Sequence, residues 1–322
     1  SSLQTNYLTR LFFKFRRNFK RTKSNRMISY SQNCEDVILS RIFKEKIKGF
    51  CVDIGACHPV HDSVTKHFYE LGWRGINIEP QPEMFELLRK DRGHDINLQA
   101  AITDRSSDVV LYIPESRANS TCSEEVAKTY LNHGEVLDKV VVKTLSLNEL
   151  WSVYGGDKQV DFLKIDVEGL EVEILKSADL GIVNPSILVI ESTRPQSTDS
   201  VFTEWEHFIE NHYRYFYFDG LNRFYHRKDY SIDAEGMAVP PNVFDDYILW
   251  TEEDKNRQLH KAVEQNKELI SRIRADTRNM ERERKAFEDK VIGLENAYHE
   301  LLEKQRSWER SLLGRLYEKI FN

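Results

Sequence analysis

The chain has 322 residues, 40% of them hydrophobic, which is enough for one substantial core and too little for several large domains. Its net charge is −6, but the first 27 residues carry eight Lys or Arg and no acid, which leaves −14 for the remainder. We find no apolar stretch near the roughly 18 residues of a membrane span, no signal-peptide pattern, and no metal-binding spacing of the four cysteines, and we therefore expect a cytoplasmic protein with reduced thiols.

Residues 1–26 form a basic N-terminal arm in which phenylalanines are interspersed with Lys and Arg. An amphipathic basic helix of this kind would lie at the inner face of an anionic membrane. A basic arm that contacts nucleic acid or a partner protein would look similar, and a solvated chain end is the third alternative. Binding to nucleic acid is the least favoured of these alternatives, because the rest of the chain has a net negative charge of −14.

Residues 27–250 form the predicted main domain, in which short apolar runs alternate with amphipathic segments. Continuous apolar strands separated by helices are typical of a parallel sheet covered on both faces. The prediction is therefore an α/β fold with a doubly wound sheet. The expected strands are 50–54, 75–78, 96–102, 162–167 and 187–190, and the clearest expected helices are 81–90 and 168–177.

Two further pairs of strands are expected in this domain. Residues 109–113 and 140–147 would pair at an edge around an irregular insertion. Residues 213–218 and 223–226 flank Asp219-Gly220, a dipeptide that favours the positive φ angles of a tight turn. A terminal antiparallel hairpin is therefore predicted to complete the sheet.

Residues 251–322 are predicted to form a coiled coil and a C-terminal tail. From Leu259 to Leu312, seam residues follow one another at alternating intervals of four and three, which is a heptad repeat. The β-branched and Leu residues in the seam favour a parallel dimer, about 80 Å long at 1.5 Å per residue. We expect homo-oligomers formed through residues 259–312, with a single helix packed against the domain as the alternative. Four polar seam residues weaken the repeat or fix its register, namely Asn266, Thr277, Arg284 and Gln305.

Acidic residues and a glycine stand at the ends of two predicted strands. Asp53 lies at the tip of the first strand, and Gly55 allows the backbone to approach a ligand closely. The G-x-G-x-x-G pattern of dinucleotide-binding proteins is missing here, which argues against NAD and FAD. Glu79, after the second strand, can accept hydrogen bonds from the two hydroxyls of a ribose. The pattern indicates a nucleoside ligand without pyrophosphate, such as S-adenosylmethionine.

Four motifs in this order carry a resemblance to a known family. They are SQNCED at 31–36, FCVDIGA at 50–56, GWRGINIEP at 72–80 and DFLKIDVEG at 161–169. Through them the chain resembles the FkbM family of methyltransferases over about residues 27–228. The resemblance implies a class I (Rossmann-like) methyltransferase fold, S-adenosylmethionine as cofactor, and a hydroxyl acceptor on a sugar or natural product.

The resemblance also implies where the cofactor lies. Cys34 stands where many members of the family have glycine, which leaves the geometry of the loop at 32–36 open. The implied cofactor-binding residues are Asp53, Gly55 and Ala56 beside the amino-acid portion, Glu79 and Pro80 at the ribose, Ala101 near adenine, and Gln32 and Asp36 in the preceding loop.

Methyl transfer to oxygen requires a group that removes the proton of the acceptor hydroxyl. The candidate bases are Asp166, Glu168 and His58. Asp166 could instead hold the ammonium group of the cofactor, and Glu168 could stabilise a helix N-terminus through the helix dipole. Together with Glu191 these two acids could bind a divalent metal. Acids at strand ends are common without metals, so we expect no resident metal.

The leading hypothesis is an O-methyltransferase that acts on a saccharide, as part of a glycan or glycolipid precursor. The coiled coil would then tether the enzyme to a polysaccharide-assembly complex or near the membrane. The polar segment 116–123 is either a lid over the acceptor or an ordinary loop. The alternative function is an inactive methyltransferase-like scaffold that oligomerises through its coiled coil. The intact Asp53, Gly55, Glu79 and Asp166 argue against this alternative.

Overall fold

A computed structural model describes residues 26–321 except 116, 118 and 196. The predicted basic arm therefore lies, apart from Arg26, outside the described residues. The chain divides into two compact units, Ser1–Glu253 and Asp254–Asn322.

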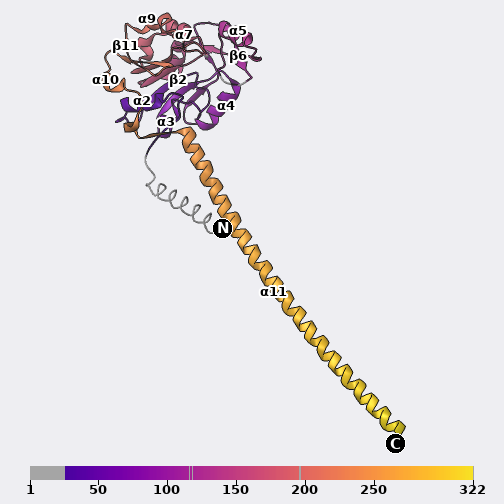
Figure 1. Ribbon diagram of the computed structural model, residues 1–322. Helices are drawn as coiled ribbons and strands as arrows, with labels where there is room; N and C mark the ends of the chain where they lie inside the picture. The colour runs from indigo at the N-terminus through magenta and orange to yellow at the C-terminus, as the bar shows by residue number, and fades with distance from the viewer. Residues whose placement is uncertain (1–25, 116, 118, 196, 322) are drawn as a thin grey trace. The chain divides into compact units, whose positions relative to one another are not determined.

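The main domain is built on one mixed sheet of seven strands (Figure 1). Its strands are β2 (Phe50–Ile54), β3 (Arg74–Ile78), β4 (Ile96–Leu98), β9 (Phe162–Ile165), β10 (Ile187–Glu191), β11 (Tyr213–Phe218) and β12 (Asn222–Arg227). The spatial order is β11, β12, β10, β9, β2, β3, β4. The strands from β10 to β4 run parallel, whereas β12 is antiparallel to both β10 and β11. The α/β class predicted from the sequence is confirmed.

Six further strands of the described residues pair outside this sheet. They are β1 (Met27–Ser29), β5 (Ala101–Ile102), β6 (Val109–Pro114), β7 (Leu137–Val142), β8 (Thr144–Leu145) and β13 (Tyr247–Leu249). β1 pairs with β13 and β5 with β8, both in parallel, and β6 pairs with β7 in antiparallel fashion. The expected pairing of 109–113 with the start of 140–147 is therefore present, but as a separate sheet.

Two of the predicted strands were too long. The expected strand 96–102 is divided into β4, in the main sheet, and β5, whose amide at Ala101 donates to the carbonyl of Lys143 at 2.9 Å. The expected strand 140–147 is likewise divided into β7 and β8. One polar residue stands at each break, Gln99 at the first and Lys143 at the second, and a single polar residue does not reveal a change of pairing partner.

Capping groups in the sequence fix where several helices begin. Pro82 occupies the first turn of α4, and the Ser123 hydroxyl accepts from the Val126 amide at the start of α5. Ser146 and Glu149 cap α6 reciprocally. The helices of the domain are α2 (Glu35–Ile42), α3 (Lys66–Glu70), α4 (Pro82–Asp91), α5 (Glu124–Asn132), α6 (Leu147–Leu150), α7 (Glu171–Ser177), α8 (Leu180–Val183), α9 (Glu206–Ile209) and α10 (Ala234–Met237), with a π-helical turn at Trp151–Gly155 and 3₁₀ turns at Phe202–Glu204 and Val243–Asp245.

Both faces of the central strands are buried in apolar clusters. Along β10, Leu188 and Ile190 belong to one cluster, and Ile187 and Val189 belong to another. Successive side chains of a strand point to opposite faces, so these clusters cover the two sides of the sheet. With the faces closed, the ends of the strands are the part of the sheet that a ligand can reach.

The C-terminal unit is formed by α11 (Trp250–Phe321), one uninterrupted helix of 72 residues whose first turn belongs to the main unit (Figure 1). At 1.5 Å per residue it is about 108 Å long. The predicted C-terminal helix is confirmed, and its pairing into a coiled coil stays a prediction. Apolar residues of the heptad seam are exposed, among them Ile273 at 55% and Leu294 at 70%. Within the part of the chain that the structure describes, no helix has the length and apolar content required to span a membrane.

Candidate functional site

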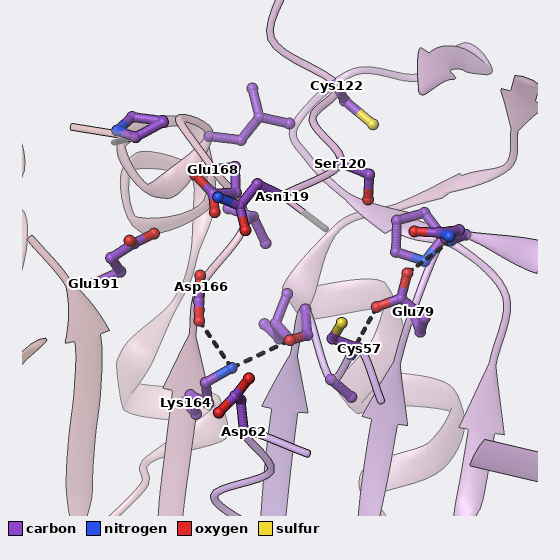
Figure 2. A pocket seen from close by; sticks show the side chains of 18 of the residues that line it. Cys57, Asp62, Glu79, Asn119, Ser120, Cys122, Lys164, Asp166, Glu168 and Glu191 are labelled. Carbon is purple, nitrogen blue, oxygen red and sulfur yellow. Dashed lines mark hydrogen bonds and ion pairs between the residues drawn. The ribbon is translucent and has the colours of Figure 1, made fainter. Parts of the chain in front are cut away.

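A cavity of about 780 Å³ opens at the carboxyl ends of the parallel strands (Figure 2). Its lining comes mainly from the segments that follow β2, β3 and β9 and from the end of β10. Ligands of open parallel sheets bind in this place, where the connections from neighbouring strands diverge. The sequence-predicted residues that line the cavity are Gln32, Gly55, Ala56, Glu79, Pro80, Ala101, Asp166 and Glu168.

The loops that follow β2 and β9 approach each other closely at Gly55. This residue has φ of 80°, and a Cβ placed on it would lie 1.7 Å from the carbonyl oxygen of Asp166. The amides of Gly55 and Ala56 both donate to the carbonyl of Ile78 at 3.0 Å. The sequence predicted that Gly55 permits a close backbone approach to a ligand. In the structure Gly55 instead approaches the loop that follows β9, at the carbonyl of Asp166, and both residues line the cavity.

Glu79 holds a buried carboxylate at the end of β3. It is 4% exposed, and its two oxygens accept from the amides of Cys57 at 2.8 Å and Gln81 at 2.7 Å. Burial raises the pKa of this carboxyl to about 7, although both amide bonds act in the opposite direction. Figure 2 shows the side chain directed toward the cavity. Each oxygen keeps a further lone pair with which it can accept a hydrogen bond from a ligand.

Lys164 lines the cavity and forms ion pairs with two of the predicted acids. Its Nζ is 3.1 Å from Asp166 Oδ2 and 3.5 Å from Asp53 Oδ1, and it donates to the carbonyl of Gly55 at 3.1 Å. Burial alone would lower the pKa of this amine, but the carboxylates of Asp166 and Asp53 outweigh it and raise the pKa above its usual value. Asp53 is 1% exposed and does not line the cavity. Its effect on a ligand would pass through Lys164.

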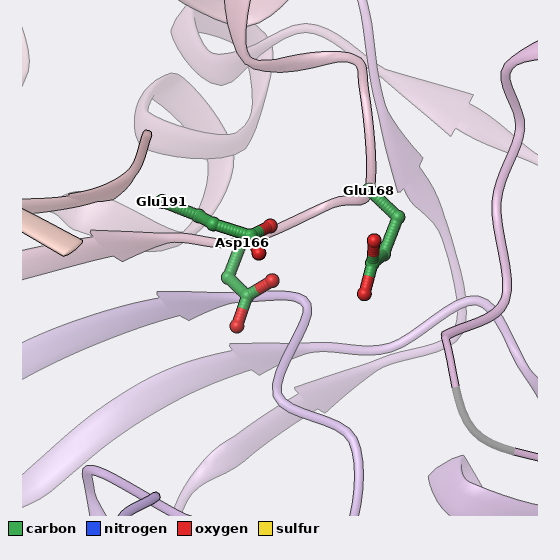
Figure 3. A group of neighbouring side chains, drawn as sticks. All are labelled: Asp166, Glu168 and Glu191. Atoms are coloured by element: carbon green, nitrogen blue, oxygen red, sulfur yellow. The ribbon is translucent and has the colours of Figure 1, made fainter. Parts of the chain in front are cut away.

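Three acids gather on the opposite side of the cavity from Glu79. Asp166 follows β9, Glu168 lies two residues later, and Glu191 ends β10. Each offers a carboxylate oxygen, and these oxygens all lie within 4.8 Å of one another (Figure 3). Burial, followed by the charge of Asp166, raises the pKa of Glu168 to about 8, and the same causes raise the pKa of Glu191 well above its ordinary value.

Glu168 does not belong to a helix, contrary to the expected helix at 168–177. Glu168 and Gly169 have φ of 54° and 103°, outside the right-handed helical region, so α7 begins only at Glu171. The Glu171 carboxylate accepts from the amides of Val167 and Gly169, both at 3.1 Å. Glu171 therefore performs the helix-terminal role that the sequence suggested for Glu168, and Glu168 remains free to face the cavity.

The loop before α2 brings Gln32 to the cavity but keeps Asp36 away from it. Asp36 is fully buried, and it accepts from the Ser29 hydroxyl at 2.7 Å and from the Tyr30 amide at 2.8 Å. It therefore fixes the loop and does not line the cavity. Cys34 adopts a left-handed conformation with φ of 60°. Glycine adopts this conformation without steric strain, which fits the expectation from the resemblance that glycine suits this position.

His58 is not brought to the cavity. Its Nδ1 accepts from the amides of Val60 at 3.1 Å and His61 at 3.0 Å, so the ring organises the loop after β2. Burial, followed by the nearby His61, lowers the pKa of this imidazole. Although Cys57 and Asp62 line the cavity, His58 does not. A role as general base is therefore unsupported by its position.

Several lining residues were missed from the sequence. Glu35 lines the cavity and accepts from the Asn222 side chain at 2.8 Å, which ties α2 to β12. Lys164 also lines it, and the signal that could have identified it is a lone charge within an apolar strand. Polar residues of two loops complete the lining, and their role depends on loop geometry that the sequence pattern does not contain. Those missed are Thr193, Arg194, Ser197 and Thr198, whereas Arg117, Asn119 and Ser120 belong to the segment 116–123 that the sequence analysis named as a lid or an ordinary loop.

Comparison with known proteins agrees with this geometry. A search of the curated proteins gave no match. The family model of the methyltransferase FkbM domain matches residues 53–230, a segment that holds the end of β2 and the whole of β3, β9 and β10, with the ends that form the cavity. The matched segment is more than half of the chain. The chain therefore belongs to the methyltransferase FkbM domain family and is a methyltransferase.

Proposed function

We propose that this protein transfers a methyl group from S-adenosylmethionine to a hydroxyl of a saccharide, as part of a glycan or glycolipid precursor. The observation that carries the proposal is a single cavity that joins the buried carboxylate of Glu79 to the acids around Asp166. The mixed sheet supports the doubly wound, class I (Rossmann-like) arrangement that the family implies. The strand ends lack the glycine-rich loop that a pyrophosphate would require.

The lining residues suit the parts of this cofactor. Glu79 can accept hydrogen bonds from both ribose hydroxyls, and Ala101 with Ile102 offers apolar contact for adenine. Asp166 offers a carboxylate to the ammonium group. S-adenosylmethionine supplies a methyl group on a sulfonium, and its transfer breaks the methyl–sulfur bond as the methyl–oxygen bond forms.

The protein must hold the acceptor oxygen in line with the methyl group and remove its proton. Asp166 is already paired with Lys164 at 3.1 Å. Glu168 Oε2 is buried and has no hydrogen-bond partner among the described residues. We therefore favour Glu168 over Asp166 as the group that accepts the proton.

Polar side chains near these acids support an acceptor rich in hydroxyls. Asn119 and Ser120 come from the loop before α5, and Thr193, Ser197 and Thr198 come from the loop after β10. Hydroxyl and amide groups both donate and accept hydrogen bonds, as recognition of a saccharide requires. The segment 116–123, predicted as an acceptor lid or an ordinary loop, thus contributes to the cavity.

The test is calorimetric binding of S-adenosylmethionine to the full chain. Glu79→Gln should weaken binding by at least about tenfold, because a hydrogen bond to a charged group contributes about 1.5–3 kcal/mol. Glu86→Gln, on the exposed side of α4, is the matched control and should bind like the unmodified chain. If the folded, unmodified chain shows no detectable binding, the proposed enzymatic function is refuted and the alternative of an inactive scaffold is favoured. Methylation of saccharide acceptors then identifies the substrate.

We also propose that α11 pairs with the same helix of a second copy. Its seam residues from Leu259 to Leu312 keep the heptad spacing and include many exposed apolar side chains. Ile273→Glu places a charge in the seam and should shift the sedimentation coefficient toward that of a monomer. Arg272→Glu, one residue away and outside the seam, should leave it unchanged. Equal sedimentation of all three chains would refute the pairing.

A further inference from the structure

Three carboxyl groups converge from two neighbouring parallel strands. β9 and β10 pair in register, with Ile165 opposite Ile190, so Glu191 lies beside the segment that carries Asp166 and Glu168. Figure 3 shows the carboxylate groups of all three acids grouped at the strand ends. The oxygens that they offer lie within 4.8 Å of one another. Such proximity of like charges is unfavourable unless something between them is positive.

The protein supplies only part of that positive charge. Lys164 contacts Asp166 at 3.1 Å, on the side that faces Asp53. Among the described residues, no ion pair joins Lys, Arg or His to Glu168 or Glu191 within 4.0 Å. With all three acids ionised, three carboxylates and one ammonium would leave about two negative charges at this end of the cavity.

Glu191 in particular has no partner of opposite charge. It is 7% exposed, so water covers little of it, and the hydrogen-bond partner of its carboxyl among the described residues is the carboxyl of Asp166, another acid of the group. Its neighbours are the other two acids. Glu168 Oε2 is buried without a partner. Buried polar atoms in folded proteins are paired, and an unpaired carboxylate directed into a cavity indicates a missing ligand.

We propose that Asp166, Glu168 and Glu191 bind one divalent cation of the oxygen-preferring class, such as Mg²⁺ or Mn²⁺. Oxygen ligands lie about 2.0–2.6 Å from such ions, so oxygens on one ion are at most about 5 Å apart, which the observed spacing satisfies. The two positive charges of such an ion would neutralise the residual negative charge of the three acids. The proposal departs from the expectation from the sequence that no metal is resident.

The part that the ion would play in methyl transfer rests on the proposed function, whereas its binding does not. Ions of this class keep water or substrate oxygens in their remaining positions. Neighbouring hydroxyls of a saccharide would replace water there, and the ion would favour loss of a hydroxyl proton. A carboxylate that binds the ion through one oxygen keeps its second oxygen, and the Glu168 oxygen would receive that proton.

Titration of the full chain with Mn²⁺ alone tests the site. The protein is first treated with EDTA and exchanged into metal-free buffer without cofactor or acceptor, and bound Mn²⁺ is followed by electron paramagnetic resonance. One saturable site per chain is expected, and Mg²⁺ should displace the Mn²⁺. Glu191→Gln and Glu168→Gln should each weaken binding by at least about tenfold, the loss typical even for an outer-shell partner of a metal. Glu86→Gln, which removes an acid outside the cavity, should bind as the unmodified chain does.

Two results would overturn the proposal. One is the absence of saturable Mn²⁺ binding by the unmodified chain, whose folding is verified by circular dichroism. The other is unchanged binding in both Glu191→Gln and Glu168→Gln. Binding of S-adenosylmethionine measured in EDTA separates the two proposals. Cofactor binding without Mn²⁺ binding refutes only the metal site, and Mn²⁺ binding without cofactor binding refutes only the proposed function.

Discussion

Glu79 and Glu191 stand at the two sides of one cavity and differ in what surrounds them. Both are more than nine-tenths buried, and burial raises the pKa of both. Glu79 is held by the amides of Cys57 and Gln81, whereas Glu191 faces Asp166 and Glu168. The same residue type at the ends of two strands of one sheet, β3 and β10, is therefore suited to two ligands. An amide-held carboxylate accepts hydrogen bonds from hydroxyls, and a carboxylate among carboxylates attracts a cation.

The difference begins in the backbone that follows each strand. After β3 the chain turns at Pro80 into α4, which leaves the Gln81 amide facing back to Glu79. After β10 the chain continues toward the hairpin, and the amide of Ser192 donates to the carbonyl of Leu221 at 2.9 Å. That amide is therefore engaged elsewhere and does not reach the acids.

Gly55 connects the two sides, and changing it should have the largest effect. In Gly55→Ala the new Cβ meets the carbonyl of Asp166, so the loops after β2 and β9 must separate. We expect loss of cofactor binding and a free energy of unfolding lower by about 3 kcal/mol or more. Urea unfolding followed by tryptophan fluorescence measures this change.

Gly72→Ala is the matched control for this substitution. Gly72 also has a positive φ, of 91°, but a Cβ there would have no atom within 4 Å. The substitution Gly72→Ala should lower the free energy of unfolding only by the backbone strain, about 1–2 kcal/mol, and the variant should still bind the cofactor. Equal losses in the two variants would show that the contact with Asp166 is unimportant.

Glu191→Gln should reduce the pH dependence of stability. The folded chain holds this proton more tightly than the unfolded chain, so the free energy of unfolding falls as pH rises above 4.5, the ordinary pKa. The neutral variant lacks this loss. Relative to the unmodified chain, it should gain stability throughout the range from pH 4.5 to 8. Urea unfolding in EDTA, without cofactor, is the measurement.

Glu79→Gln should change the dependence of the free energy of unfolding on pH less than Glu191→Gln does. The two amides that hold the Glu79 carboxylate offset part of the cost of burial, so the pKa reaches about 7. The free energies of unfolding of this variant and of the unmodified chain should therefore diverge only between about pH 4.5 and pH 7. A larger change for Glu79→Gln than for Glu191→Gln would mean that the amides do not distinguish the two sides of the cavity.

The sequence was sufficient for the parts of the site that depend on one strand and its end. Gly55, Ala56, Glu79 and Asp166 follow apolar strands directly, and parallel strands bring their carboxyl ends to one edge. Those predictions needed only the strand positions and their direction.

Predictions that depended on loop conformation were less accurate. His58 and Asp36 stand close in sequence to residues that line the cavity, but local hydrogen bonds hold both elsewhere. Glu168 was assigned to a helix because its left-handed φ leaves no trace in residue type. Glu191 was considered only as a metal ligand, since its closeness to Asp166 follows from the pairing of β9 with β10, not from sequence spacing.

The pairing of β1 with β13 has a consequence for engineering the domain. Met27 lies opposite Tyr247 and Ser29 opposite Leu249, so the first and last strands of the domain are neighbours. Paired strands are about 5 Å apart and each residue advances about 3.3 Å, so a linker of a few residues can join position 249 to position 27. The exposed turn at Gly134 could then carry new termini. A circular permutant of this kind would retain the cavity while moving both chain ends to another face of the domain.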